Sequence, residues 1–222
     1  MQILTLGINH HTAPIQVREQ VAFTPEMIQP ALHHLKNHLA SVSETHLPGA
    51  TILSTCNRTE ITGFAERPCQ LIELLCEFTE GSIQEFAKFS NVYKNQEAIN
   101  QLFRIGTGLE SQILGDYEIV GQLRQAFKLA KKMKTTNAYV ERLMNSVLQA
   151  SKKVKNETML SSGTTSVSYA AVKYITKNLP DYNSKNILVF GLGKMGKHTC
   201  KNLTEYTDIN DVCLINRTEE KA

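Results

Sequence analysis

The chain has 222 residues, of which 41% are hydrophobic and 20% are charged, and its formal net charge is +3. These proportions are typical of a soluble globular protein, and the length allows one large domain or two small ones. No apolar run approaches the roughly 20 residues that a membrane-spanning helix needs. The opening MQILTLGINHH lacks the basic and apolar regions of a signal peptide, so we expect a cytoplasmic protein.

Residues 1–94 alternate between strand and helix patterns. A helix is expected from Pro25, with Thr24 as its N-cap, and another begins near Pro68. Strands are expected at four apolar runs, namely ILTLGI, TILST, EITGFAE and NVYK. The resulting order, β-α-β-β-α-β, is typical of a ferredoxin-like unit.

Residues 95–160 have apolar residues near 3.6 spacing, which predicts helices. The pattern occurs in NQEAINQLFRIGTGL, GDYEIVGQLRQAFKLAKKMK and NAYVERLMNSVLQASKKVKNE. The polar stretch 161–166 is the best linker candidate, and the helical pattern SVSYAAVKYITKNL follows it. We therefore expect one domain over residues 1–160 and a second over residues 161–222.

The five cysteines are odd in number and none has Cys-x-x-Cys spacing, so neither a disulfide framework nor a metal site is indicated. Cys56 lies in a polar loop between two apolar runs, ATILS and EITGFA. The cationic Arg58, two residues on, could favour the thiolate or hold a substrate carboxylate. The remaining cysteines lie in apolar helix or strand patterns and are expected in the core: Cys69, Cys76, Cys200 and Cys213.

A glycine-rich turn follows the apolar strand ILVF and opens a helix. It matches the G-x-G-x-x-G fingerprint of dinucleotide-binding folds, with residues Gly191, Leu192, Gly193, Lys194, Met195 and Gly196. Such glycines allow a tight turn, the approach of a pyrophosphate and close helix packing, and the helix N-terminus offers free N–H groups to phosphates. The alternative is a glycine-rich turn that binds no ligand.

The tip of the next strand favours one nicotinamide cofactor. NAD-binding folds usually carry an acid there, about 20 residues after the glycines, but this chain has Asn216, Arg217 and Thr218. A guanidinium and a hydroxyl suit a ribose 2′-phosphate, and Glu219 and Glu220 come late for the acid. We therefore expect NADPH. The expected fold class is α/β: an α+β ferredoxin-like unit with a helical extension, then a partial Rossmann-like NADP-binding domain.

Positive charge is concentrated in residues 122–155, which hold nine basic residues and one acid, Glu141, for a net charge of +8. The rest of the chain carries −5. Two interpretations stay open, a solvated helical face and a surface that contacts phosphates. Aromatic residues do not interleave with the charges, and no known nucleic-acid motif is present.

A loop thiol and a nicotinamide site on one chain suggest a reductase that works through a thioester. A thiolate attacks an ester and forms an acyl-enzyme, and hydride from NADPH then releases an aldehyde.

Four stretches of the chain resemble the glutamyl-tRNA reductases, in the family's own order: GINHHTAP at 7–14, STCNRTE at 54–60, GLESQILGDYEIVGQ at 108–122, and GLGKMG with NRTEEKA within 191–222. The resemblance covers nearly the whole chain. It implies NADPH-dependent reduction of glutamyl-tRNA(Glu) to glutamate-1-semialdehyde, the first step of five-carbon tetrapyrrole biosynthesis. Residues 1–160 (ferredoxin-like unit 1–94, helices 95–160) would be the catalytic, tRNA-binding domain, and residues 161–222 an incomplete NADPH-binding domain.

The resemblance also implies roles for single residues. Cys56 would be the nucleophile, Gly191–Gly196 would hold NADPH, and the basic segment would face the tRNA. Arg58 would bind the free carboxylate of the glutamate side chain, and the acids would bind its α-ammonium group. The substrate pocket would consist of Thr55, Asn57, Arg58, Ser111, Asp116, Tyr117, Glu118 and Gln122. Further implied partners are a second copy, if the full protein has a C-terminal dimerisation domain, and the downstream aminomutase; no membrane partner is expected.

The chain departs from the family pattern at three places. Gln101 stands where the family has a histidine before LFR, and Gly115-Asp116-Tyr117-Glu118 replaces the usual Gly-Glu-x-Gln. His10 and His11 are nearby imidazoles whose role can equally be structural, so no general base is assigned. The family continues beyond two strands of the dinucleotide fold, so the chain is either a fragment or a shortened form.

Three hypotheses from different classes therefore stand. The first is an NADPH-dependent glutamyl-tRNA reductase, which the intact TCNR sequence favours. The second is a non-catalytic family member that binds tRNA or a partner, which Gln101 favours slightly. The third is an NADP-dependent reductase of another acyl thioester, against which the basic helices argue mildly.

Overall fold

The structure is a computed structural model that describes residues 2–42, 49–160, 166–209 and 211–218. The chain divides into two compact units, Met1–Leu160 and Ser161–Ala222. Within the described ranges, no helix is long and apolar enough to cross a lipid bilayer.

The first unit is built on an antiparallel sheet whose strands lie in the order β2-β3-β1-β4. Their bounds are β1 (Gln2–Asn9), β2 (Ala50–Thr55), β3 (Arg58–Ala65) and β4 (Asn91–Lys94). β1 lies in the middle and pairs with β3 along its whole length, from Gln2 opposite Ala65 to Asn9 opposite Arg58. This order and orientation are those of the ferredoxin-like unit predicted from the sequence, and the fold class is confirmed.

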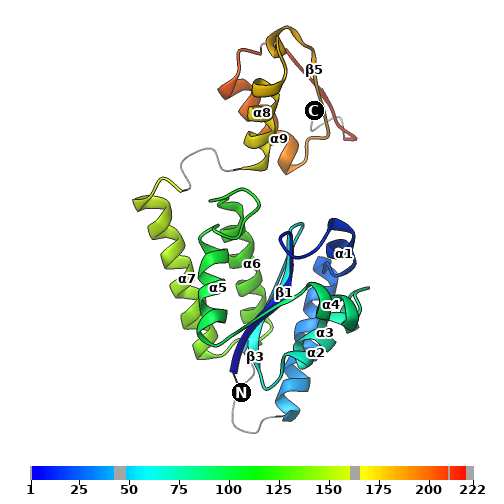
Figure 1. Ribbon diagram of the computed structural model, residues 1–222, viewed down its shortest axis with the longest axis vertical. Helices are drawn as coiled ribbons and strands as arrows, with labels where there is room; N and C mark the ends of the chain where they lie inside the picture. Colours follow the sequence, from blue (N-terminus) through cyan, green and yellow to red (C-terminus); the bar gives the residue numbers. More distant parts are fainter. Residues whose placement is uncertain (1, 43–48, 161–165, 210, 219–222) are drawn as a thin grey trace. The chain divides into compact units, whose positions relative to one another are not determined.

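Helices cover both faces of this sheet (Figure 1). One layer consists of α1 (Ile15–Gln20), α2 (Pro25–Val42), α3 (Pro68–Phe78) and α4 (Ile83–Phe89). The other layer consists of α5 (Gln96–Gly106), α6 (Glu118–Lys132) and α7 (Ala138–Glu157). Side chains alternate across a strand, so the two faces of β1 contribute to different hydrophobic cores. Leu4 and Leu6 pack in the core on the side of α2 and α3, and Ile3 packs in the core on the side of α5, α6 and α7.

The segment around the α5–α6 connection contains less helix than the sequence pattern predicts. The pattern runs to Leu109 and resumes at Gly115, but α5 ends at Gly106 and α6 begins at Glu118. Gly108 and Gly115 have φ values of +78° and +81°, a left-handed conformation that ends a right-handed helix. A Cβ on Gly115 would also lie 2.0 Å from the Leu160 carbonyl oxygen.

The second unit has two layers, a pair of parallel strands and the helices packed on it. It consists of α8 (Val167–Asn178), the 3-10 turn η1 (Tyr182–Ser184), β5 (Ile187–Phe190), α9 (Lys194–Tyr206) and β6 (Val212–Ile215). β5 pairs with β6 from Ile187 opposite Val212 to Phe190 opposite Ile215. One face of the pair packs on the helices around Leu203, whereas Phe190 on the other face is 83% exposed.

The expectation that four cysteines pack in the core is wrong for two of them. Cys69 and Cys213 are exposed, and Cys76 and Cys200 are partly buried. The buried face of α3 is formed by Leu71, Leu74 and Leu75, and Cys69 lies on a different face because it is two residues from Leu71. Cys213 points to the uncovered face of the parallel pair.

Candidate active site

Cys56 lies in the two-residue turn of a β-hairpin. Thr55 ends β2 and pairs with Arg58, which begins β3, so that Cys56 and Asn57 alone connect the strands. The side chain of Cys56 is exposed, and the Asn57 N–H donates to Thr55 Oγ1 at 3.2 Å. The strand–loop–strand predicted around this thiol is therefore present, and the thiol is accessible.

Two residues from elsewhere in the chain hold the backbone of this turn. The backbone N–H of His10, which follows β1, donates to the Asn57 carbonyl at 2.9 Å. Arg18, on α1, donates through Nη1 to the Cys56 carbonyl at 2.9 Å and to Asn57 Oδ1 at 3.1 Å. Arg18 is absent from the residues predicted from the sequence. Both carbonyl groups of the turn are thereby fixed from outside the hairpin.

Arg58 lies inside the protein and is already paired. Only 2% of Arg58 is exposed, and its Nη1 forms an ion pair with Glu60 Oε1 at 3.0 Å. Its Nη2 donates to the backbone carbonyl of Glu110. Burial raises the pKa of the Glu60 carboxyl, although the adjacent Arg58 charge acts in the opposite direction. Alternate residues of a strand share a face, so the 58/60 spacing was a usable signal for this pair.

The loop after α5 brings further charge to the same place. Glu110 accepts from Arg104 Nε at 2.6 Å and lies 3.9 Å from His11 Nε2. An open cleft of about 480 Å³ lies beside it, lined by Val92, Tyr93, Glu97, Asn100, Gln101, Arg104 and Glu110. Gln101 is buried, and its Nε2 has no hydrogen-bond partner among the described residues. The position that departs from the family pattern therefore lines this cleft.

His10 is an uncharged imidazole next to the turn. Burial lowers its pKa to about 4, and the neighbouring charges of His11, Arg58 and Arg18 act in the same direction. Neither ring nitrogen of His10 has a hydrogen-bond partner within the described ranges, and the ring of His11 lies over it at 3.9 Å between centroids. At neutral pH His10 is therefore a neutral imidazole and cannot act as an imidazolium acid.

The other predicted pocket residues follow Glu110 along the chain. Ser111 lies in the loop between α5 and α6, where its N–H donates to the Gly108 carbonyl. Asp116 accepts from the Glu118 N–H at 2.9 Å, so it caps the start of α6. The Lys155 Nζ lies over the Tyr117 ring, 4.1 Å from the ring centroid.

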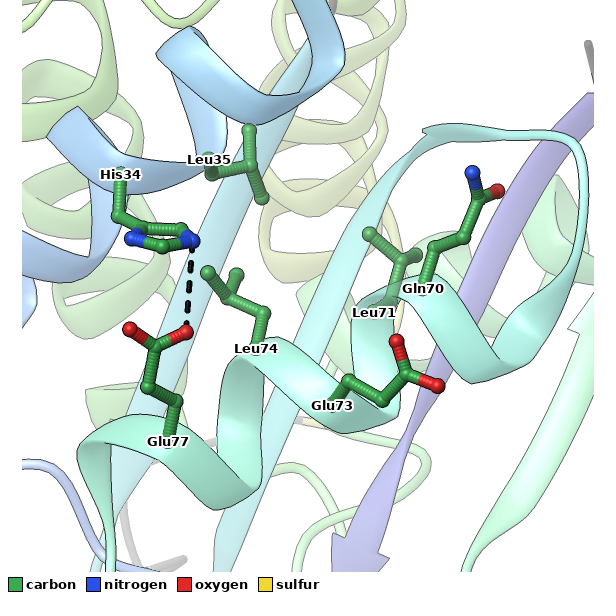
Figure 2. Close-up of a pocket in the computed structure, with 7 residues that line it drawn as sticks. All are labelled: His34, Leu35, Gln70, Leu71, Glu73, Leu74 and Glu77. Atoms are coloured by element: carbon green, nitrogen blue, oxygen red, sulfur yellow. Dashed lines mark ion pairs between the residues drawn. The ribbon is translucent and has the colours of Figure 1, made fainter. Parts of the chain in front are cut away.

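Gln122 lines a different hollow from the one beside Gln101. This hollow, of about 430 Å³, lies along the outer edge of β2 between α2 and α6, and its wall includes Phe23, Ser54 and Gln122. A third, small cavity of about 90 Å³ lies between α2 and α3, where His34 and Glu77 form an ion pair at 3.3 Å (Figure 2). None of the predicted site residues lines that cavity.

The predicted cofactor turn in the second unit has the geometry that a diphosphate needs. Gly191 has a φ of +99°, and a Cβ on Gly196 would lie 1.9 Å from the Gly191 carbonyl oxygen. A Cβ on Gly193 would meet no described residue within 4 Å, so the backbone there is open to a ligand. Asn216 Oδ1 accepts from the Leu192 N–H at 3.0 Å and ties the β6 tip to the turn.

An open hollow of about 590 Å³ lies over this turn and the first turn of α9, where Lys194 and Met195 line it together with the glycines. Arg217 and Thr218 at the β6 tip are exposed. The residues present therefore fit a dinucleotide, with phosphates at the helix N-terminus. No cluster of three or more His, Cys, Asp or Glu side chains that could hold a metal ion occurs within the part of the chain that the structure describes.

The basic residues of segment 122–155 lie on α6, on α7 and, for Lys134, between these helices. All nine are exposed: Arg124, Lys128, Lys131, Lys132, Lys134, Arg142, Lys152, Lys153 and Lys155. Lys131 pairs with Glu141 at 2.9 Å and Lys153 approaches Glu157 at 3.8 Å. Such exposed pairs contribute little to stability, so this positive surface stays available to an anionic partner. We call these nine residues the basic surface.

A family profile described as "Glutamyl-tRNAGlu reductase, N-terminal domain" matches residues 6–158. The chain belongs to the glutamyl-tRNA reductase family. A second profile, described as "Shikimate / quinate 5-dehydrogenase", matches residues 173–222. The second match supports a nucleotide-binding domain of Rossmann type in the second unit.

Similar proteins agree with the family. The chain is 50% identical over 98% of its length to a glutamyl-tRNA reductase of Christiangramia forsetii, and 46% identical over 98% to one of Flavobacterium psychrophilum. It resembles the solved structure of a glutamyl-tRNA reductase from Methanopyrus kandleri, with a TM-score of 0.64 and 26% identity over 99% of this chain. The chain spans about half the length of these three proteins.

Proposed function

We propose that the chain carries the thioester-forming half-reaction of an NADPH-dependent glutamyl-tRNA reductase, with Cys56 as nucleophile. The observation that supports this most is an exposed thiol on a turn whose carbonyls are fixed by His10 and Arg18. Fixing the nucleophile removes much of the entropic cost of bringing it to an ester. Residues 1–160 would then be the catalytic and tRNA-binding domain, and residues 161–222 the cofactor-binding domain.

The first step forms a carbon–sulfur bond and breaks the ester bond to the tRNA. The Cys56 thiolate attacks the glutamyl carbonyl carbon, and the tRNA 3′ oxygen leaves and takes up a proton. The Gln101 amide, whose Nε2 has no partner among the described residues, and the Thr55 hydroxyl would donate hydrogen bonds to a carbonyl or carboxylate oxygen of the substrate. The buried Arg58 would act through Glu60 and Glu110, because its Nη1 donates to the Glu60 carboxylate and its Nη2 to the Glu110 carbonyl.

The cofactor would bind at the turn Gly191–Gly196, with Arg217 and Thr218 beside a ribose 2′-phosphate and Asn216 holding the turn. When bound, NADPH supplies the hydride that releases the acyl group from Cys56 as an aldehyde. The basic surface would contact the tRNA phosphates, which makes tRNA binding weaker as salt rises. Dimerisation and hand-off to an aminomutase stay predictions.

Mass spectrometry of Cys56 tests the proposal. Labelled glutamate supplied on tRNA, without NADPH, is expected to become attached to Cys56 and to come off with hydroxylamine. Cys56→Ser is expected to abolish the adduct while tRNA binding is retained, because an alcohol is a far weaker nucleophile than a thiolate. Cys69, which is also exposed, is the control, and Cys69→Ser is expected to form the adduct normally.

A folded wild-type chain that acquires no adduct would refute the catalytic proposal. If that chain still bound tRNA in a salt-dependent manner, the non-catalytic binding hypothesis would replace it. The buried, neutral Gln101 is the feature that gives this second function weight.

A further inference from the structure

The charge next to the reactive turn comes from an unexpected arginine. The sequence predicts Arg58 as the cation that serves Cys56, but its guanidinium is buried, ion-paired with Glu60 and bonded to Glu110. Arg18 instead contacts the turn itself, with Nη1 on the Cys56 carbonyl and on Asn57 Oδ1. The two arginines thus hold different parts of the site.

Arg18 bonds to both residues of the turn and thereby restrains it. One nitrogen bonds to the backbone of Cys56 and to the side chain of its only neighbour in the turn, at 2.9 Å and 3.1 Å. These bonds connect residues 38 and 39 positions apart, so they also fix α1 to the hairpin. The Arg18 Nε is buried and has no hydrogen-bond partner in the described part of the chain.

We propose that Arg18 is the positioning residue of the Cys56 turn, and that it sets the direction of the thiol for attack on the ester. The catalytic part of this inference rests on the proposed function, but the mechanical part does not. A turn of two residues has few other constraints: the His10 N–H fixes the Asn57 carbonyl, and the Cys56 carbonyl depends on Arg18. A misplacement of about 1 Å can reduce the rate of a positioned reaction about 100-fold.

The experiment compares Arg18→Met with Lys88→Met, which removes one exposed positive charge from α4. Hydrogen–deuterium exchange of the segment 53–60 is expected to become about 10-fold faster in Arg18→Met and to stay unchanged in the control, because amides exchange through local opening. Arg18→Lys keeps the charge without the planar fork and is expected to show an intermediate rate. If Arg18→Met does not fold, Asn57→Ala removes one of the two acceptors and takes its place.

Acylation separates positioning from binding. At saturating glutamyl-tRNA, the single-turnover rate of adduct formation on Cys56 is expected to fall about 100-fold in Arg18→Met, with the half-saturating concentration unchanged. Alkylation of Cys56 by iodoacetamide, a small reagent that needs no fixed direction, is expected to stay within about two-fold, relative to Cys69 in the same chain.

Unchanged exchange in segment 53–60 would overturn the proposal, whatever the activity. Faster exchange with undiminished acylation would refute the role in the reaction. A wild-type chain that forms no adduct would refute the proposed function alone, since the exchange data still decide whether Arg18 holds the turn.

Discussion

The Cys56 site and the glycine turn differ in what shapes them: buried side chains in the first, and exposed backbone in the second. The first is built from side chains: Arg58, Glu60 and Glu110 meet in the interior and hold one another in place. The second is built from the absence of side chains, because Gly193 and Gly191 present open backbone. A thiol that must meet one carbon atom needs rigid neighbours, whereas a diphosphate needs bare N–H groups at a helix end.

The two regions should therefore fail in different ways. Breaking the ion pair in the first unit leaves an uncompensated charge in a low-dielectric interior. Adding a methyl group in the second unit either collides with backbone or blocks the ligand, depending on the glycine.

The largest effect is expected from breaking the Arg58–Glu60 pair. Glu60→Gln leaves the buried Arg58 without its counter-charge and is expected to lower the free energy of unfolding by about 3–5 kcal/mol. Denaturant unfolding followed by circular dichroism measures it. The exposed Glu73→Gln, on α3, is the control. If Glu60→Gln cost no more than Glu73→Gln, the site would not depend on buried charge.

A smaller effect is expected from two matched substitutions in the glycine turn. Gly196→Ala puts a Cβ 1.9 Å from the Gly191 carbonyl and is expected to destabilise the second unit by about 1–3 kcal/mol. The Cβ of Gly193→Ala meets nothing within 4 Å among the described residues, so the variant is expected to retain stability and to weaken NADPH binding instead. Thermal unfolding and cofactor titration separate the two; equal stability losses would contradict the assignment of distinct roles.

The features predicted correctly from the sequence are those that depend on neighbours along the chain. Short apolar runs predicted the strands of the sheet, and the turn between β2 and β3 followed from the polar residues around Cys56. The glycine spacing predicted the strand–turn–helix of the second unit. Each of these signals lies within a few residues of the structure that it specifies.

The features that were missed depend on short helices or on distant contacts. α1 and α4 have six and seven residues, too few to show a 3.6-residue period, although the capping box of Ser82 and Glu85 was a visible signal for α4. The contact of Arg18 with Cys56 spans 38 residues. Such a contact follows from how α1 lies on the hairpin, which no local pattern specifies.

A smaller effect again is expected on the selectivity for NADPH over NADH. Arg217 is exposed at the β6 tip, and at the proposed NADPH site Arg217→Asp replaces attraction of a 2′-phosphate by repulsion. The dissociation constant for NADPH is expected to rise about 10-fold or more, and that for NADH much less. Isothermal titration with both cofactors measures this. Equal losses would show that the Arg217 side chain does not read the 2′-phosphate.

The pH dependence of stability is expected to include a contribution from His10. Its pKa of about 4 in the folded chain is below the ordinary 6.5 of the unfolded chain. Between these values the unfolded state binds more protons, so His10 contributes stability above pH 6.5 that is lost as the pH falls toward 4.

His10→Gln removes that contribution. The slope of unfolding free energy against pH is expected to flatten by at most about 1.4 kcal/mol per pH unit, and by less where solvent screens the half-buried ring. The raised pKa of Glu60 acts with the opposite sign, so only the difference between wild type and variant, measured from pH 4 to 7, isolates His10. Equal slopes would mean that His10 takes up its proton as readily in the folded site as in the unfolded chain.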